Sequence, residues 1–299
     1  MDDSIFSTAV LPVALAVIMV SLGMSLTLAD FRRVVEQPRG VAIGLLNLLV
    51  LSPLLAFAIA EAFNLDPVFA VGLVLLGASP GGILANLMTH FARGETALSI
   101  TMTAISSVAA VVTVPLFLKL ATHHFGAGQL DMSVNLVGVV ARVLLITVVP
   151  LALGMWLRVR RPEAVARIGP GLRRATAVLF AAAVIGVIIA ESDRVTDNLQ
   201  ALVLATLTLN IAAMSMSFTI ARLARLDNRQ ATAIAMELGI HNSTLAIAVG
   251  ASIATVLTVP AAVYASIMFI PAGLFAWLMY RRNAAAEARL GPAPPPAPS

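Results

Sequence analysis

One acidic residue stands apart from the other ionisable groups of this sequence. Glu237 lies well inside a long apolar run, whereas the rest of the 15 acidic residues lie in predicted loops or near helix ends. A carboxylate at membrane depth is energetically costly and marks a functional site by default. It stays charged only beside a cation and otherwise takes up a proton. We therefore expect Glu237 either to ligate an alkali ion or to carry a proton.

Other side chains have the oxygen atoms that a hard cation such as sodium requires. Asn86 follows a Pro-Gly-Gly sequence in one apolar run, and Ser99 and Thr103 lie in the next run. Ser99 and Thr103 are spaced i, i+4 on a predicted helix, so they share one face. Serine and threonine in membrane helices also bond to their own backbone, so this spacing alone leaves both roles open.

Two apolar runs are interrupted by helix-breaking or polar residues, at 77–82 (Gly-Ala-Ser-Pro-Gly-Gly) and at 237–244 (Glu-Leu-Gly-Ile-His-Asn-Ser-Thr). Pro80 removes a backbone donor and Gly81 relaxes the backbone. In lipid, a helix is broken only where protein or a water-filled cavity satisfies the freed groups. A broken helix presents carbonyls to a cation and amides to an anion. We expect both kinds of ligand where the two breaks meet.

His241, in the second break, has two interpretations. A neutral ring would form a structural hydrogen bond within the break. A protonated ring would repel a nearby cation and would couple transport to pH. Both interpretations stay open at this point.

The elements that must position these residues are membrane helices. Of the 299 residues, 60% are hydrophobic and 11% are charged, against roughly 45 to 50% and 25% in soluble domains. Apolar stretches of roughly 20 residues, long enough to cross a bilayer, recur along the chain. We predict an all-α integral membrane protein with about nine transmembrane helices, at 5–28, 40–63, 67–92, 96–120, 135–157, 175–191, 200–221, 230–253 and 257–280.

The ends and loops of this layout carry the remaining expectations. Residues 1–283 form the predicted transmembrane domain, and residues 284–299 form a disordered, proline-rich cytoplasmic tail. All but three of the 19 Lys and Arg residues fall on one side of nine alternating spans; the exceptions are Lys119, Arg142 and Arg194. The positive-inside rule then places the C-terminus in the cytoplasm and the N-terminus outside a plasma (inner) membrane. The basic segment 158–174 is interpreted as a loop that fixes this topology.

The same distribution of charge excludes other classes of protein. The isoelectric point near 10.6 reflects arginines beside lipid headgroups and does not indicate nucleic-acid binding. The sequence has no cysteine, which excludes disulfides and thiolate metal sites. It shows no intramembrane nucleophile with a base, no Asp pair and no His-x-x-x-His motif. We therefore expect no enzyme and no metal other than sodium.

The two interrupted segments are where the chain resembles the bile acid:sodium symporter family. The likeness is sharpest at residues 80–89 (Pro-Gly-Gly-Ile-Leu-Ala-Asn-Leu-Met-Thr), continues to residue 99, and returns at 237–243 (Glu-Leu-Gly-Ile-His-Asn-Ser). It extends across almost the whole membrane domain, in the nine-helix form of the family. The resemblance implies a panel domain and a core domain with two crossed, discontinuous helices. Because the two breaks run in opposite senses, they also suggest an inverted repeat.

The resemblance further implies two sodium sites. The first would use the side chains of Asn86, Ser99, Thr103 and Glu237. The second would use Glu237, the main-chain oxygens of Leu238 and Ile240, and the side chain at His241. This sequence departs from the family pattern at Ala85, where a serine is usual, and at His241 and Leu48, where glutamines are usual. One sodium, or one sodium with a proton on His241, therefore fits better than two.

The leading functional expectation is sodium-coupled symport of a small or amphipathic organic anion by alternating access. The classes that the family implies are bile-acid-like compounds, keto acids and vitamin-precursor carboxylates. The substrate is expected at the crossing, near Asn86, His241, Asn242, Pro80 and Gly81. Two alternatives stay open: a proton-coupled transporter that uses Glu237 and His241, and a membrane receptor that does not transport.

Overall fold

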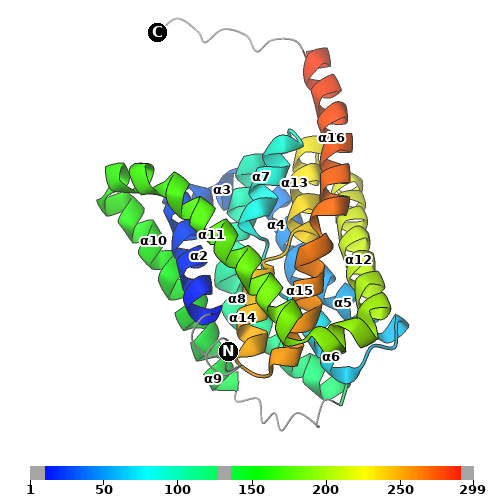
Figure 1. Cartoon of the computed structure of the whole chain (residues 1–299). Helices are drawn as coiled ribbons and strands as arrows, with labels where there is room; N and C mark the ends of the chain where they lie inside the picture. Colours follow the sequence, from blue (N-terminus) through cyan, green and yellow to red (C-terminus); the bar gives the residue numbers. More distant parts are fainter. Residues whose placement is uncertain (1–10, 127–135, 291–299) are drawn as a thin grey trace, which may run out of the picture.

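The chain folds into a bundle of helices (Figure 1). The computed structural model describes residues 11–126 and 136–290, and in these ranges every regular element is helical. The first half contains α2 Leu11–Ser25, α3 Leu28–Glu36, α4 Pro38–Leu46, η2 Asn47–Leu51, α5 Ser52–Ala62, α6 Pro67–Gly77, α7 Ile83–Phe91 and α8 Thr96–His124. The second half contains α9 Leu136–Val143, η3 Leu144–Val148, α10 Val149–Arg160, α11 Pro162–Ala190, α12 Ser192–Leu223, α13 Asn228–Gly239, α14 Ser243–Ala251, η4 Thr255–Thr258, α15 Val259–Ile267 and α16 Phe269–Leu290.

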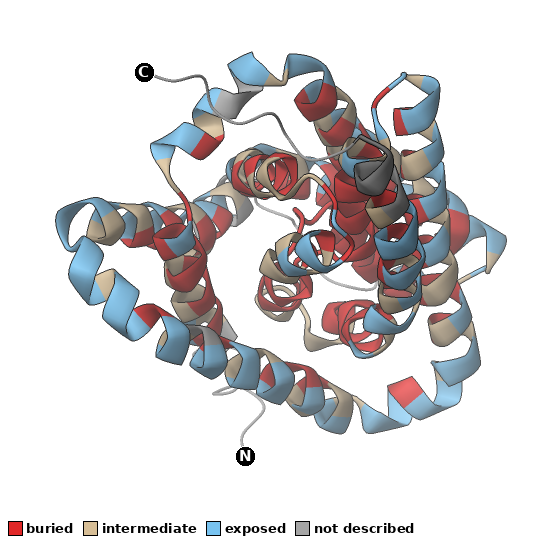
Figure 2. Cartoon of the chain, turned by 90° about the horizontal axis from the view of Figure 1, so that it is seen from above, coloured by how far each residue is buried: buried red, intermediate tan, exposed pale blue. Residues whose placement is uncertain are grey.

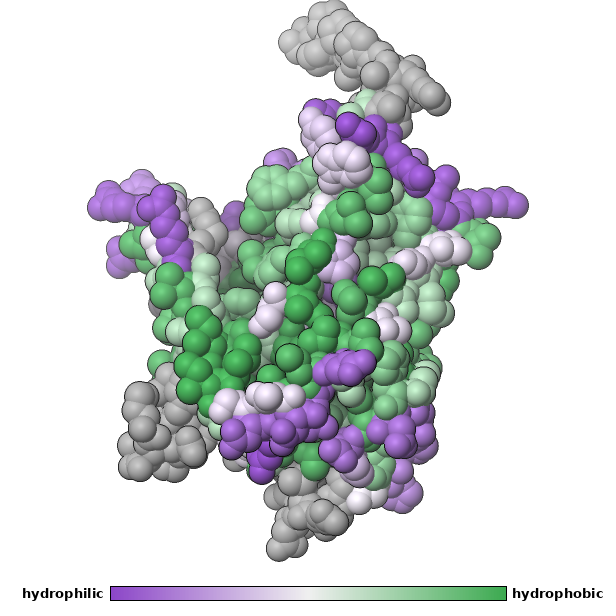
Figure 3. Space-filling view, turned by 45° about the vertical axis from the view of Figure 1, so that its right-hand side comes forward, coloured by the Kyte–Doolittle hydropathy of each residue, from purple (hydrophilic) through white to green (hydrophobic). Residues whose placement is uncertain are grey.

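The helices have the length and composition of membrane spans. Within the described ranges, five helical runs are long and apolar enough to cross a bilayer: Pro38–Ala62, Thr96–His124, Pro162–Ala190, Ser192–Leu223 and Thr255–Ala284. Pro12–Ser25 and Pro67–Gly77 are shorter apolar helices. A broad hydrophobic band lies between two hydrophilic ends of the molecule (Figure 3). These features support the predicted class of integral membrane protein, and the count of nine crossings stays a prediction.

The structure corrects the predicted starts of the sixth and seventh spans. The basic segment 158–174, expected to be a loop, is helical except for Arg161. α11 begins at Pro162, and proline is well tolerated in the first turn of a helix. Residues 192–199, also expected in a loop, form the start of α12. Alanine and arginine, which are frequent in residues 163–174, favour helix, so α11 extends on the N-terminal side of its apolar stretch.

Two further boundaries differ from the prediction. The first predicted span, 5–28, ends at Ser25, and α3 begins as a separate helix in which the Thr27 amide donates to the Asp30 carboxylate at 2.7 Å. At the other end, α16 continues to Leu290, past the predicted boundary at residue 284. Alanine, glutamate, arginine and leucine dominate residues 284–290, and all four favour helix. The proline-rich residues 291–299 lie outside the described part of the chain.

Both predicted interruptions are present, and they meet. The first separates α6 from α7, and the second separates α13 from α14. The Gly82 amide donates to the Ile240 carbonyl, and the Asn242 amide donates to the Pro80 carbonyl, both at 2.8 Å. Gly81 and His241 therefore form an antiparallel bridge. Each break satisfies backbone groups of the other, as a broken helix in lipid requires.

Helices pack in two groups around this crossing. α2 packs against α10 and α11, and we call these three helices the outer group. α7 and α13 pack against each other and against α8, while α14 packs against α15. α2 also contacts α14, and α11 contacts α15, so the outer group lies beside the crossing. Seen from above, buried residues concentrate inside the bundle and exposed residues line its outside (Figure 2).

Candidate ion and substrate site at the helix crossing

Four side chains predicted to form the first cation site lie in mutual contact. Asn86 belongs to α7, Ser99 and Thr103 belong to α8, and Glu237 lies near the end of α13. The Ser99 hydroxyl lies 2.7 Å from Asn86 Oδ1 and 2.6 Å from Glu237 Oε1. The Thr103 hydroxyl lies 2.8 Å and 3.0 Å from the two Glu237 oxygens and 3.3 Å from Asn86 Oδ1. Three helices thus bring their oxygen atoms to one point.

This cluster has more acceptor atoms than hydrogens to share among them. The acceptors are Asn86 Oδ1 and both oxygens of the Glu237 carboxylate. Each hydroxyl, of Ser99 and of Thr103, has one hydrogen to donate. The Ser99 hydroxyl therefore cannot satisfy Asn86 and Glu237 at the same time, although it is within 2.7 Å of both. A bound cation relieves such an excess, because every one of these oxygens can then turn a lone pair toward it.

The Glu237 carboxyl is isolated from compensating positive charge. The residue is fully buried, and none of the described lysine, arginine or histidine side chains forms an ion pair with it. Removing an unpaired carboxylate from water costs several kcal/mol. The position therefore requires either a cation or a proton, as expected from the sequence.

Gly81 makes room for the carboxylate at the crossing. A Cβ atom on Gly81 would overlap Glu237 Oε2. The first break therefore approaches the cation site closely at a position where a larger side chain would displace the carboxylate. The small size of Gly81 thus allows the Glu237 carboxylate its position, whereas the sequence pattern predicted Gly81 beside the substrate.

One further hydroxyl joins the cluster. Thr89 Oγ1, one turn after Asn86 on α7, lies 3.3 Å from Ser99 Oγ and is buried. Its i, i+3 spacing from Asn86 is the signal in the sequence that could have identified it.

The members expected in a second sodium site make other contacts. His241 is buried, with Nε2 2.7 Å from Ser52 Oγ and Nδ1 3.4 Å from the Tyr264 hydroxyl. The Ile240 carbonyl accepts the Gly82 amide. Leu48, where the resembling family has a glutamine, is buried and aliphatic. The structure therefore places the hydroxyls of Ser52 and Tyr264 beside the two ring nitrogens of His241.

A buried polar network behind His241 was missed by reasoning from the sequence. Asn210 Nδ2 and the Tyr264 hydroxyl both donate to the Gly239 carbonyl, at 2.7 Å and 2.8 Å, and they lie 3.0 Å apart. This network satisfies a carbonyl freed by the second break. An asparagine within the apolar run of α12 was the available signal, because a buried amide in a membrane helix needs a partner.

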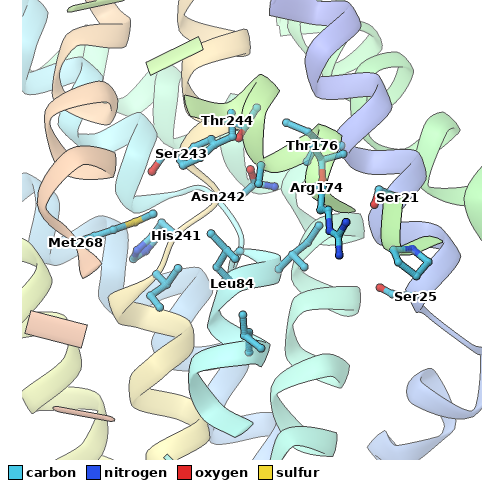
Figure 4. Close-up of a pocket in the computed structure, with 18 residues that line it drawn as sticks. Ser21, Ser25, Leu84, Arg174, Thr176, His241, Asn242, Ser243, Thr244 and Met268 are labelled. Carbon is cyan, nitrogen blue, oxygen red and sulfur yellow. The ribbon is translucent and has the colours of Figure 1, made fainter. Parts of the chain in front are cut away.

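A cavity of about 610 Å³ lies between the outer group and the crossing. His241 and Asn242, both predicted to bind substrate, line it, whereas Asn86, Pro80 and Gly81 are absent from its described lining. Asn242 also caps α14, since its side chain accepts the Leu245 amide at 3.1 Å. Figure 4 shows Asn242 between Ser243 and Thr244 on one side and Arg174 on the other.

The start of each second half-helix faces this cavity. Gly82 and Ile83, at the start of α7, and Ser243 and Thr244, at the start of α14, belong to its lining. Unpaired amides at a helix start attract an anion. In addition, the Ser243 hydroxyl is buried and has no hydrogen-bond partner among the described residues. The crossing thus places a cluster of oxygen atoms and the starts of two half-helices close to each other.

Comparisons with known proteins relate the chain to membrane transporters. Residues 12–198 match the Sodium Bile acid symporter family. The chain is 31% identical over 241 residues to the "Probable sodium/metabolite cotransporter BASS1, chloroplastic" of Arabidopsis thaliana, an alignment that covers 79% of this chain and 58% of that protein.

Two other relatives are covered more fully. The "Uncharacterized sodium-dependent transporter YocS" of Bacillus subtilis is 31% identical over 79% of this chain and 71% of its own length. The human "Ileal sodium/bile acid cotransporter" is 26% identical over 82% of this chain and 70% of its own length. The relatives are transporters and not enzymes, as expected for this chain.

Proposed function

The chain belongs to the Sodium Bile acid symporter family, and we propose that it is a sodium-coupled symporter of an organic anion in the plasma membrane. The observation that carries this proposal is the oxygen cluster of Asn86, Ser99, Thr103 and Glu237, buried at the crossing without a cationic side chain from the described residues. A sodium ion supplies the missing positive charge and satisfies the excess of acceptors.

Coupling follows from the position of the two ligands on one pair of broken helices. Sodium joins α7, α8 and α13 through their side-chain oxygens, while the anion meets the starts of α7 and α14 across the same breaks. A cation that fixes the geometry of the crossing favours the anion, and by linkage the anion favours the cation equally. The proposed substrate classes are the ones that the family resemblance implies: bile-acid-like compounds, keto acids or vitamin-precursor carboxylates.

We assign one sodium ion to each transport cycle. In the second site implied by the family, His241 replaces the usual glutamine. Its ring nitrogens contact the hydroxyls of Ser52 and Tyr264, so the ring has no free lone pair to offer a second cation. Sodium-dependent uptake should therefore show a Hill coefficient near one. A coefficient near two would contradict this assignment.

The proposed architecture has nine crossings of residues 1–283, an inverted repeat, and a core that moves against a panel. The outer group corresponds to the panel, and the helices around the crossing correspond to the core. Alternating access would then open the cavity to one side of the membrane at a time. The N-terminus is proposed to lie outside, with the C-terminus and the corner between α10 and α11 facing the cytoplasm.

The test is uptake into proteoliposomes of purified protein, with cholate and pyruvate as labelled probes. A sodium gradient should drive uptake, whereas a potassium gradient should not, and Glu237→Gln should abolish the sodium-driven component. Uptake driven by a pH gradient without sodium would instead support proton coupling through Glu237 and His241. Stabilisation of the protein by a probe, with no flux under any gradient, would support a receptor.

A further inference from the structure

We propose that Arg174 of α11 receives the acid group of the transported anion and so selects acids over their neutral analogues. This inference rests on the proposed function and assigns a recognition residue to it. The sequence had placed Arg174 in a basic loop that fixes topology. The structure places it within a long helix and in the lining of the cavity beside the crossing.

Arg174 is the sole arginine, lysine or carboxylate residue in the described lining of the cavity. It makes no hydrogen bond or ion pair with any other described residue. Two other described arginines do have partners: Arg158 donates to the Met24 carbonyl at 3.0 Å, and Arg222 donates to the Leu226 carbonyl. A guanidinium with five donors therefore stands open to a ligand in the cavity.

The position of Arg174 argues against a role at the membrane surface. It lies twelve residues beyond Pro162, the start of α11, which corresponds to about 18 Å along the helix. An arginine that only anchors a helix extends toward the headgroups. Here the side chain instead lies between the crossing and α2, with Asn242 on one side and Ser21 and Ser25 on the other (Figure 4).

The rest of the cavity can hold the apolar part of the substrate. Its remaining wall is largely apolar, with Leu84 from α7, Phe180 from α11 and Met268 near the start of α16 among its members. Polar residues lie across the cavity at the start of α14, where Asn242, Ser243 and Thr244 belong to its lining. An acid at Arg174, an apolar body and a hydroxyl or carbonyl near Ser243 together fit this lining.

The chemistry explains why a guanidinium is suited to this position. It binds a carboxylate, sulfonate or sulfate through two parallel hydrogen bonds. In a mostly apolar cavity, a neutral amide or ester gains much less from the same arginine. Acid selectivity therefore depends on Arg174, whereas sodium binding depends on the cluster around Glu237.

The experiment measures binding of two acids and of their primary amides to the purified full-length protein in saturating sodium. The pairs are cholate with cholamide, and pyruvate with pyruvamide. For an acid that the parent binds, the ratio of acid affinity to amide affinity should fall roughly tenfold to a hundredfold in Arg174→Gln. Arg174→Lys should retain part of the ratio, because it keeps the charge and loses the paired geometry.

Arg167→Gln is the matched control. It removes the same charge from the same helix two turns earlier, at an exposed position outside the cavity lining, and it should leave the ratio unchanged. Because the ratio compares two ligands on one protein, partial unfolding of a variant does not change it.

The proposal is overturned if Arg174→Gln keeps the parent's ratio, if Arg167→Gln lowers it equally, or if the parent binds neither acid or prefers the amide. Sodium-driven uptake by the parent in the same preparation separates this failure from failure of the proposed function. A parent that shows sodium-driven uptake while Arg174→Gln keeps full acid preference leaves the symporter intact and rejects Arg174.

Discussion

At the scale of single residues, the site is defined by an imbalance between acceptors and hydrogens. The hydroxyls of Ser99 and Thr103 lie within 3.3 Å of both the Glu237 carboxylate and the Asn86 amide oxygen. Glu237 is fully buried. The residue types were evident in the sequence, because Glu237 is an acidic residue deep in an apolar run and Asn86 follows a break. Their convergence from three helices was implied by the family resemblance and not by the pattern itself, since spacing along one helix cannot report contacts between helices.

The close approach of Gly81 to Glu237 gives a prediction with a steric basis. Gly81→Ala should weaken sodium affinity at least tenfold, because the added methyl overlaps Oε2 and must displace the carboxylate. Gly273→Ala is the control, since nothing lies within 4 Å of its added Cβ. The measurement is sodium-dependent thermal stabilisation of each variant in detergent. Equal sodium responses in the two variants would refute the steric role.

The two hydroxyls of α8 should act as cation ligands. Ser99→Ala and Thr103→Val should each weaken sodium affinity roughly tenfold, because each removes an oxygen from the cluster. Thr113→Val is matched on the same helix, since its hydroxyl bonds only to the Ala109 carbonyl at 3.2 Å. Sodium titrations of probe uptake measure the effect. If all three substitutions shifted the titration alike, the hydroxyls would have only a structural role.

At the scale of elements, the two breaks support each other. Residues 80–82 and 240–242 exchange backbone hydrogen bonds that each helix lost at its break. Proline and glycine in one run, and a cluster of polar residues in the other, made the breaks predictable. The helical course of residues 162–174 was not predictable from hydropathy, which detects the apolar part of a helix and not its polar continuation. For the same reason Arg174 was assigned to a loop.

Asn242 caps α14 and lines the cavity, so its effect on stability must be separated from its effect on transport. Asn242→Ala should lower the free energy of unfolding by about 1 kcal/mol, because the Leu245 amide loses its acceptor. Asp227→Ala removes the equivalent cap at the exposed start of α13, where the Asp227 carboxylate accepts the Gln230 amide at 2.8 Å. Thermal denaturation should show similar losses, whereas only Asn242→Ala should reduce uptake. A matching loss of uptake in Asp227→Ala would assign both effects to stability.

At the scale of the whole molecule, charge distribution and architecture agree. The corner between α10 and α11 and the C-terminal end of α16 lie at one end of the molecule, and the turn between α11 and α12 lies at the other (Figure 1). The first end carries Arg160, Arg167 and Arg282. The family match fixes the class of protein, while the transmembrane count and the orientation rest on hydropathy and on the positive-inside rule.

Orientation can be measured directly, because the chain has no cysteine of its own. In intact cells, a membrane-impermeant maleimide should label Asp197→Cys at the predicted outer end and should not label Arg282→Cys. Both positions are exposed, so permeabilised cells should label both. The reverse pattern in intact cells would invert the proposed topology.

The central claim is that the oxygen cluster around Glu237 binds sodium. The most direct measurement is equilibrium binding of radioactive sodium to the purified protein, for the parent and for Glu237→Gln, which preserves the size of the side chain and removes its charge. The account predicts saturable binding of one sodium per parent chain, absent in the variant and not displaced by potassium. Saturable binding of sodium to Glu237→Gln with the parent's affinity would contradict it.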